Sequence, residues 1–192
     1  MNKINTFLQK PSAFWIILLA VVALTRLVPH IPNVSPVAAM ALFGGCYFTN
    51  RRWAFALPIA ILFISDLLLQ VGYLLGWRAF TGFHDILPYV YGSMLFITAI
   101  GILLQKYRHP AYLIGASITS SVLFFLITNF GVWWNWMRDT STLAQCYVQA
   151  IPFFRNTLLG DLLYVGVLFG VAAWVSKKYP SLAIENNPIS AS

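Results

Sequence analysis

Residues 53–76 form a continuous apolar stretch that is long enough to cross a bilayer, and one carboxylate, Asp66, lies near its middle. About 20 apolar residues in a helix cover the hydrocarbon core of a membrane. A carboxylate at that depth costs about 2.5–3.5 kcal/mol on insertion scales, so it requires a partner or a functional role. The stretch therefore predicts a membrane protein with a polar site inside the bilayer.

The composition of the whole chain favours the same class. Of its 192 residues, 59% are hydrophobic and only 9% are charged, against about 25% charged residues in a soluble domain. A small soluble protein has most of its residues near the surface, where this much apolar material cannot be hidden. We expect a single integral membrane domain over residues 1–192, with a disordered polar tail at 185–192.

Six apolar segments are predicted to form transmembrane helices, which makes the predicted fold class an all-α membrane bundle. They cover residues 12–28, 36–49, 53–75, 87–105, 111–131 and 156–176. The second segment is short for a full span, so we expect it to be tilted, partly buried or re-entrant. Within it, Ala41 and Gly45 have the four-residue spacing of small residues that is typical of helix packing in membranes.

The distribution of lysine and arginine predicts the orientation. With the N-terminus inside, the inner side holds eight basic residues and the outer half holds four, namely Arg26, Arg78, Arg138 and Arg155. An excess of basic residues marks the cytoplasmic side, so both termini are predicted to be cytoplasmic. The connections after the first, third and fifth helices are then external and are the longer ones, which is typical of loops that carry function.

Polar residues of five predicted helices fall in the outer half of the membrane when depth is counted at about 1.5 Å per residue. Asp66 lies beyond the midplane, Arg26 lies near the outer end of the first helix, and Asp161 lies in the first turns of the sixth. This shared depth predicts an outward-facing pocket for a solute. The residues predicted to line it are Arg26, Asp66, His84, Tyr89, Asn129, Trp133, Trp134, Arg155 and Asp161.

Several of these residues also have a structural interpretation. Arg26 can form an ion pair with Asp66 or with Asp161, and the sequence leaves this choice open. At a helix N-terminus, Asp161 would be stabilised by the helix dipole alone. The tryptophans at 133–136 are typical of an aromatic belt at the membrane interface. His84 is either an ordinary loop residue or an axial ligand to a metal centre that the solute carries.

Enzyme and metal-site motifs are missing from the sequence. It contains no HExxH, no glycine-rich phosphate loop and no GxSxG motif, and its three histidines are far apart in the predicted topology. We therefore expect no catalytic residues, no enzyme activity, no resident metal and no cofactor. The net charge of +7 is explained by membrane orientation, so nucleic acid is not an expected partner.

Four sequence blocks carry a resemblance to a known family. They are PNVSPVAAMALFGG at 32–45, ISD at 64–66, TNFGVWW at 128–134 and CYVQAIPFFRNTLLGDLLY at 146–164. Together they resemble a family of uncharacterised bacterial membrane proteins described as transport proteins. The wider architecture is similar to the substrate-binding S-components of energy-coupling factor (ECF) vitamin transporters.

The resemblance implies a six-helix protein of the bacterial inner membrane. It would bind a small solute at its extracellular side, under the loops after helices 1, 3 and 5. The solute would be a vitamin, a cofactor precursor or a metal complex, with cobalamin as one example. The implied partners are the ECF membrane subunit and two ATPase subunits. The first helix departs from the pattern, because Ala13, Ala20 and Ala23 lack the Ala-xxx-Ala spacing through which many S-components dock. A carrier that works alone is therefore also consistent with the sequence.

Two other functions stay open at this point. A structural or assembly subunit would use the buried charges only to order its helices, and its outer loops to dock a partner protein. A membrane-embedded enzyme would act on a lipid-linked substrate whose phosphate is held by Arg138 and Arg155. The first function predicts no small-molecule ligand, which distinguishes it from a transport protein.

Overall fold

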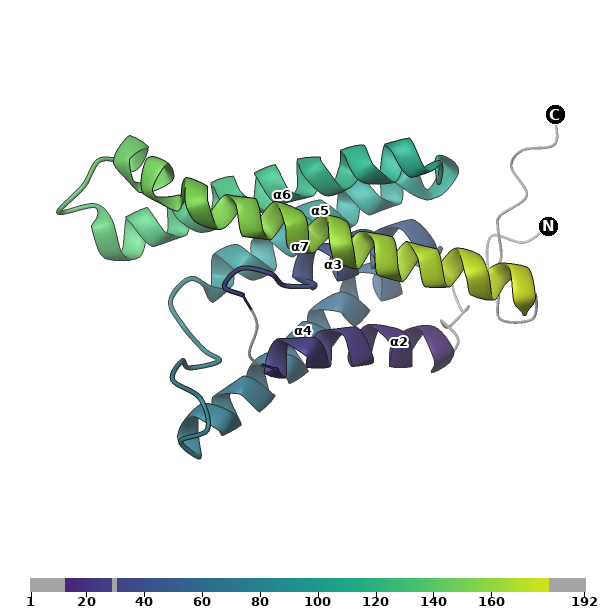
Figure 1. Ribbon diagram of the computed structural model, residues 1–192, viewed down its shortest axis with the longest axis horizontal. Helices are drawn as coiled ribbons and strands as arrows, with labels where there is room; N and C mark the ends of the chain where they lie inside the picture. The colour runs from purple at the N-terminus through teal and green to yellow at the C-terminus, as the bar shows by residue number, and fades with distance from the viewer. Residues whose placement is uncertain (1–12, 29–30, 180–192) are drawn as a thin grey trace.

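The computed structural model describes residues 13–28 and 31–179, and every regular element in this part of the chain is a helix. The elements are α2 (Ala13–Leu24), η1 (Thr25–Leu27), α3 (Val37–Tyr47), α4 (Arg51–Leu74), α5 (Leu87–Leu103), η2 (Leu104–Lys106), α6 (Pro110–Val132), η3 (Trp133–Met137) and α7 (Leu143–Lys178). They pack as one bundle in which α7 runs along the whole length (Figure 1). The predicted all-α class is confirmed for the described residues.

Four helices are long and apolar enough to cross a membrane. They are Arg51–Leu74, Leu87–Lys106, Pro110–Met137 and Leu143–Lys178. The other two apolar helices, Ala13–Leu27 and Val37–Tyr47, are shorter. The bundle is therefore that of a multi-pass membrane protein, with four helices of spanning length where six were predicted. The predicted start of the first helix at residue 12 and the predicted tail at 185–192 lie outside the described residues.

Helix α3 forms the centre of the bundle. All 11 of its residues are buried, and it packs against α4, α5, α6 and α7 (Figure 1). At about 1.5 Å per residue it covers about 17 Å, which is well short of a hydrocarbon core of about 30 Å. The second predicted helix is thus a core helix that is shorter than a full span and is enclosed by its neighbours.

Helices α3 and α5 meet backbone to backbone at Gly45 and Gly101. A Cβ atom added to Gly45 would lie 2.1 Å from the carbonyl oxygen of Thr98 and 2.9 Å from the Cα atom of Gly101. Small residues permit this close approach between helices in membranes, where association depends on van der Waals packing. The helix-packing role predicted for the small residues of this segment is confirmed at Gly45.

The largest departure from the predicted boundaries is at α7, which begins at Leu143 and not near residue 156. Thr142 and Gln145 form a capping box, in which the Gln145 N–H donates to Thr142 Oγ1 at 3.3 Å and the Thr142 N–H donates to Gln145 Oε1 at 2.8 Å. Pro152 lies inside the helix without ending it. Because η3 also prolongs α6, the long external loop predicted after the fifth helix is wrong, and only residues 138–142 connect the two helices.

The connection 75–86 folds back onto helix α4 at the end of the bundle that is predicted to face outward (Figure 1). Gln70 holds it there, since its Oε1 atom accepts hydrogen bonds from the N–H groups of Gly82 at 3.1 Å and Phe83 at 3.2 Å. A Cβ atom added to Gly82 would lie 2.1 Å from the carbonyl oxygen of Asp66. The loop therefore covers α4 directly at the level of Asp66.

Candidate functional site

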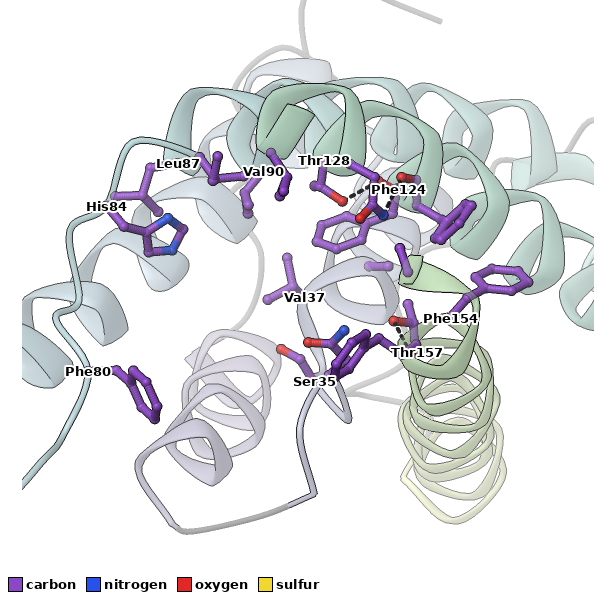
Figure 2. A pocket seen from close by; sticks show the side chains of 18 of the residues that line it. Ser35, Val37, Phe80, His84, Leu87, Val90, Phe124, Thr128, Phe154 and Thr157 are labelled. Atoms are coloured by element: carbon purple, nitrogen blue, oxygen red, sulfur yellow. Dashed lines mark hydrogen bonds between the residues drawn. The ribbon is translucent and has the colours of Figure 1, made fainter. Parts of the chain in front are cut away.

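A cavity of about 690 Å³ lies at this same end of the bundle. Figure 2 shows side chains from α3, α5, α6, α7 and the connection 75–86 arranged around one open space. Its polar lining residues are Arg26, Asn33, Ser35, Thr81, His84, Thr128, Asn129, Thr157 and Asp161. Its aromatic lining residues are Tyr73, Phe80, Phe124, Phe125, Trp136, Phe153 and Phe154. Such a mixture of apolar walls with a few polar groups is typical of sites for small molecules.

Arg26 and Asp66 form an ion pair at the edge of this cavity. Arg26 Nη1 lies 2.7 Å from Asp66 Oδ1, and the Tyr91 hydroxyl donates a hydrogen bond to Asp66 Oδ2 at 2.7 Å. Arg26 also donates to the Ser65 hydroxyl. Arg26 lines the cavity, whereas Asp66 is fully buried and does not. The choice that the sequence left open is resolved, because Arg26 pairs with Asp66 and the pair ties η1 to α4 and α5.

Asp161 is the second buried carboxylate, and its surroundings are different. It lines the cavity with only 3% of its surface exposed. The Ser121 hydroxyl donates a hydrogen bond to Asp161 Oδ2 at 2.6 Å. Among residues 13–28 and 31–179, no basic side chain lies within ion-pair distance of this carboxylate. Asp161 is therefore buried without a neutralising partner in the described part of the protein.

The position of Asp161 along its helix differs from the prediction. Because α7 begins at Leu143, Asp161 lies about five turns into the helix and not in its first turns. The favourable field of a helix N-terminus is confined to the first turn. The helix-dipole interpretation of this carboxylate is therefore wrong, and its burial requires another explanation.

His84 and Asn129 also line the cavity, as Arg26 and Asp161 do. Partial burial lowers the pKa of His84 below its ordinary value. The nearby Asp66 carboxylate opposes this lowering of the pKa and Arg26 reinforces it. The imidazole is therefore neutral at pH 7. Asn129 Nδ2 donates to the Phe125 carbonyl at 2.8 Å, within its own helix. In the described residues, no group of three or more His, Cys, Asp or Glu side chains is placed to hold a metal ion.

The remaining predicted site residues lie outside the cavity lining. Tyr89 packs between α5 and α6, where a Cβ atom added to Gly131 would lie 2.4 Å from its ring. Trp133 Nε1 donates to the Ser141 carbonyl at 2.9 Å, and the Arg138 guanidinium lies 5.4 Å from the ring centroid of Trp134. Tyr89 thus packs against the neighbouring helix α6, whereas the two tryptophans pack against residues of their own helical segment and of the short connection.

Arg155 is exposed on α7 and is not part of the lining. Arg138 is likewise exposed and forms its ion pair with Asp139. The structure therefore does not bring these two arginines into the cavity together with Arg26 and Asp161.

The cavity contains aromatic and hydroxyl residues that the sequence analysis did not select. Phe124, Phe125 and Thr128 follow Ser121 at helical spacing on α6. On α7, Asp161 is preceded at the same spacing by Phe153, Phe154 and Thr157. Counting in steps of three and four residues from Asp161 finds the row on α7. The row on α6 is related to Asp161 only through the contact of Ser121 with that carboxylate, which no local sequence pattern contains.

Trp136 is a further lining residue, and it connects two elements. Its Nε1 atom donates a hydrogen bond to Asp85 Oδ2 at 3.0 Å, which links η3 to the connection 75–86. The second half of the loop is thus fastened at two points, at residues 82–83 by Gln70 on α4 and at Asp85 by this tryptophan. The arrangement can hold a small molecule by charge, hydrogen bonds and contact with aromatic rings.

Comparisons with known proteins give one match. No curated protein matches the sequence, and no solved structure matches it. A family model described as a family of unknown function, DUF6580, matches residues 7–182, which is most of the chain. The protein therefore belongs to the DUF6580 family of unknown function.

Proposed function

We propose that this protein is a solute-binding membrane transport subunit of the bacterial inner membrane, similar in role to an ECF S-component. The observation that carries the proposal is the cavity of about 690 Å³ at the end of the bundle predicted to face outward. Pockets for small molecules are typically about 300–1,000 Å³ and are mostly apolar, with a few placed polar groups. The solute would enter from the external side and be held among the helices.

The position of the cavity supports the same role. Residues of the connections after α2 and α4, such as Asn33 and His84, line it together with the outer halves of α6 and α7. The resemblance to S-components implies a solute under the loops after helices 1, 3 and 5, and the first two of these connections contribute lining residues. Transport requires no bond chemistry, because exposing one binding site alternately to the two sides of the membrane is sufficient.

The manner of coupling to an energy source is part of the proposal. The alanines of the first helix do not form one docking face, because Ala23 is buried in the bundle while Ala13 is exposed. This favours a carrier that works alone or that docks on the ECF membrane and ATPase subunits through another surface. Vitamins, cofactor precursors and metal complexes, cobalamin among them, are the solute classes that the resemblance supplies.

The test is a cavity-filling substitution with a matched control on the same helix. Thr128 lines the cavity, whereas Thr119 is exposed on the outside of α6, and each hydroxyl donates to the carbonyl four residues earlier, at 2.7 and 2.9 Å respectively. The variants Thr128→Trp and Thr119→Trp therefore lose the same local bond and gain the same volume. Each protein is purified in detergent, and the small molecules that it retains are identified by mass spectrometry.

The proposal predicts one small molecule in the wild-type protein and in Thr119→Trp, and none in Thr128→Trp. Retention by all three proteins would place the solute elsewhere and contradict the proposed site. An empty wild-type protein that carries a stoichiometric polypeptide would instead support the structural or assembly subunit.

A further inference from the structure

The charged residues of the cavity do not balance one another, and we infer from this that the solute is an organic monocation with an apolar or aromatic body. Its positive nitrogen would contact Asp161, and its body would lie against the phenylalanines of α6 and α7. The inference rests on the proposed function and deepens it, since it assigns the chemical class of the solute.

Asp161 has no neutralising partner among the described residues. A buried carboxylate is strongly destabilising unless an opposite charge and hydrogen bonds compensate for its lost hydration. In the described residues Asp161 has one hydroxyl donor, Ser121, and no basic side chain within ion-pair distance. Its position about five turns into α7 removes the helix dipole as a source of stabilisation. A cationic group of the solute would supply the compensation.

The charges of the described cavity wall favour a cationic solute. Arg26 is the one lysine or arginine among the described lining residues, and its charge is matched by Asp66 at 2.7 Å. His84 is neutral at pH 7, because partial burial lowers its pKa. Among the described lining residues, Asp161 is then the one acidic or basic group without a counter-charge, and its ionised form is complementary to a single positive charge.

The lining residues of α7 change from aromatic to acidic with depth in the cavity. On α7, which enters the bundle from the predicted outer end, Asp161 is the last lining residue, and Thr157 precedes it by about one turn. Phe153 lies eight residues before Asp161 along the helix, which corresponds to about 12 Å of rise towards the outer end. The carboxylate therefore lies at the floor of the cavity and the aromatic layer lies above it.

The facing helix repeats this order. On α6, Ser121 reaches Asp161, and Phe124 and Phe125 line the cavity about one turn nearer the outer end. Phenyl rings next to a carboxylate attract a cation through their π faces and bind an apolar body by contact. A molecule with a cationic head and an apolar body would fit head first, with the head at Asp161.

The experiment compares three probes that share a phenylalkyl body and carry a positive, a neutral or a negative end group. They are 4-phenylbutylammonium, 4-phenylbutanol and 4-phenylbutyrate, titrated by calorimetry into the full-length protein in detergent after removal of any retained solute. We expect the wild-type protein to bind the ammonium probe about tenfold or more tightly than the alcohol, with the carboxylate probe weakest, because a charge-assisted contact is at stake. Asp161→Asn should remove this preference. Asp139→Asn is the matched control, since that carboxylate is 89% exposed, and it should keep the preference.

Other outcomes would overturn the inference. Equal binding of the alcohol and the ammonium probe by the wild-type protein would mean that Asp161 is neutral. Preference for the carboxylate probe would identify Arg26 as the anchor, and an unchanged preference in Asp161→Asn would exclude Asp161. The wild-type comparison requires no variant, so it decides the matter even if Asp161→Asn fails to fold. If the protein retains a natural solute but binds none of the three probes, only the inference about the charge of the solute is overturned. If it binds no probe and also retains no solute, the proposed function is contradicted.

Discussion

Asp66 and Asp161 are both carboxylates buried in apolar helices, yet only Asp161 lines the cavity, and among the described residues only Asp66 has a basic partner. Asp66 receives an arginine and a tyrosine hydroxyl from two other elements, and the connection 75–86 covers its helix at that level. Asp161 receives one serine hydroxyl and faces a cavity. Burial alone therefore does not identify a functional residue in a membrane. The number and charge of the partners that the protein itself supplies distinguish a structural carboxylate from one that is available to a ligand.

This comparison predicts that Asp66→Asn has the largest effect on stability. The substitution leaves the Arg26 guanidinium, whose side chain is only 16% exposed, without its counter-charge. Breaking a buried ion pair in this way costs about 3–5 kcal/mol. The measurement is the free energy of unfolding in mixed micelles. The double variant Asp66→Asn/Arg26→Met should recover most of the loss, and a double variant as unstable as the single one would contradict a role in charge pairing.

Tyr91→Phe tests the second partner of Asp66. The variant removes the hydroxyl that donates to Asp66 Oδ2 at 2.7 Å and leaves the ring in place. A hydrogen bond to a charged group contributes about 1.5–3 kcal/mol, so the free energy of unfolding should fall by about that amount. Tyr112→Phe is the control, because that side chain is 57% exposed at the other end of the bundle. Equal losses in the two variants would show that the hydrogen bond to Asp66 is not the cause.

Gly82→Ala tests the loop that covers Asp66. The added Cβ atom would lie 2.1 Å from the Asp66 carbonyl oxygen, which belongs to the rigid backbone of α4, so the loop must move away. We expect a loss of about 1–3 kcal/mol in the free energy of unfolding and faster hydrogen exchange of the Phe83 amide. Gly92→Ala on α5 is the control, because no atom lies within 4 Å of its added Cβ. Unchanged exchange in Gly82→Ala would contradict the close contact.

The smallest predicted effect is on the pH dependence of stability and concerns His84. The pKa of its imidazole is lowered from 6.5 in the folded protein, chiefly by burial, so the unfolded chain takes up this proton more readily. The contribution of the neutral His84 imidazole to the free energy of unfolding is therefore fully present above about pH 6.5 and is lost as the pH falls below that value. Unfolding midpoints measured between pH 5 and 8 should fall less steeply on acidification in His84→Gln than in the wild-type protein. Identical slopes would exclude this contribution.

The sequence predicted the two carboxylates but not the difference between them. The long apolar runs specify their helices because length and hydrophobicity alone decide membrane insertion, and α4, α5 and α6 lie close to the predicted ranges. The choice of Asp66 over Asp161 as the partner of Arg26 depends on distances between helices, which no local pattern contains. The cavity depends on the same packing, so Tyr89, Trp133 and Trp134 were predicted for it while Trp136 was not selected.

The start of α7 is a different case, because its signal was present in the sequence. Residues 143–155 contain polar residues and a proline, so they look like a loop in a hydropathy analysis. However, Thr142 and Gln145 have the spacing of a capping box, and a proline inside a membrane helix is tolerated. Reading the cap would have placed Asp161 in mid-helix and removed its helix-dipole interpretation.

The most direct test of the account measures stability and solute content together in Asp66→Asn and Asp161→Asn. Each variant is purified in parallel with the wild-type protein, its unfolding is measured after removal of solute, and its retained solute is measured by mass spectrometry before that removal. The account predicts that Asp66→Asn loses stability and that Asp161→Asn loses its solute. In the solute-free state Asp161→Asn should be at least as stable as the wild-type protein, because it removes a buried carboxylate that lacks a counter-charge among the described residues. A stable Asp66→Asn together with an Asp161→Asn variant that keeps the wild-type solute content would contradict the division of roles between the two carboxylates.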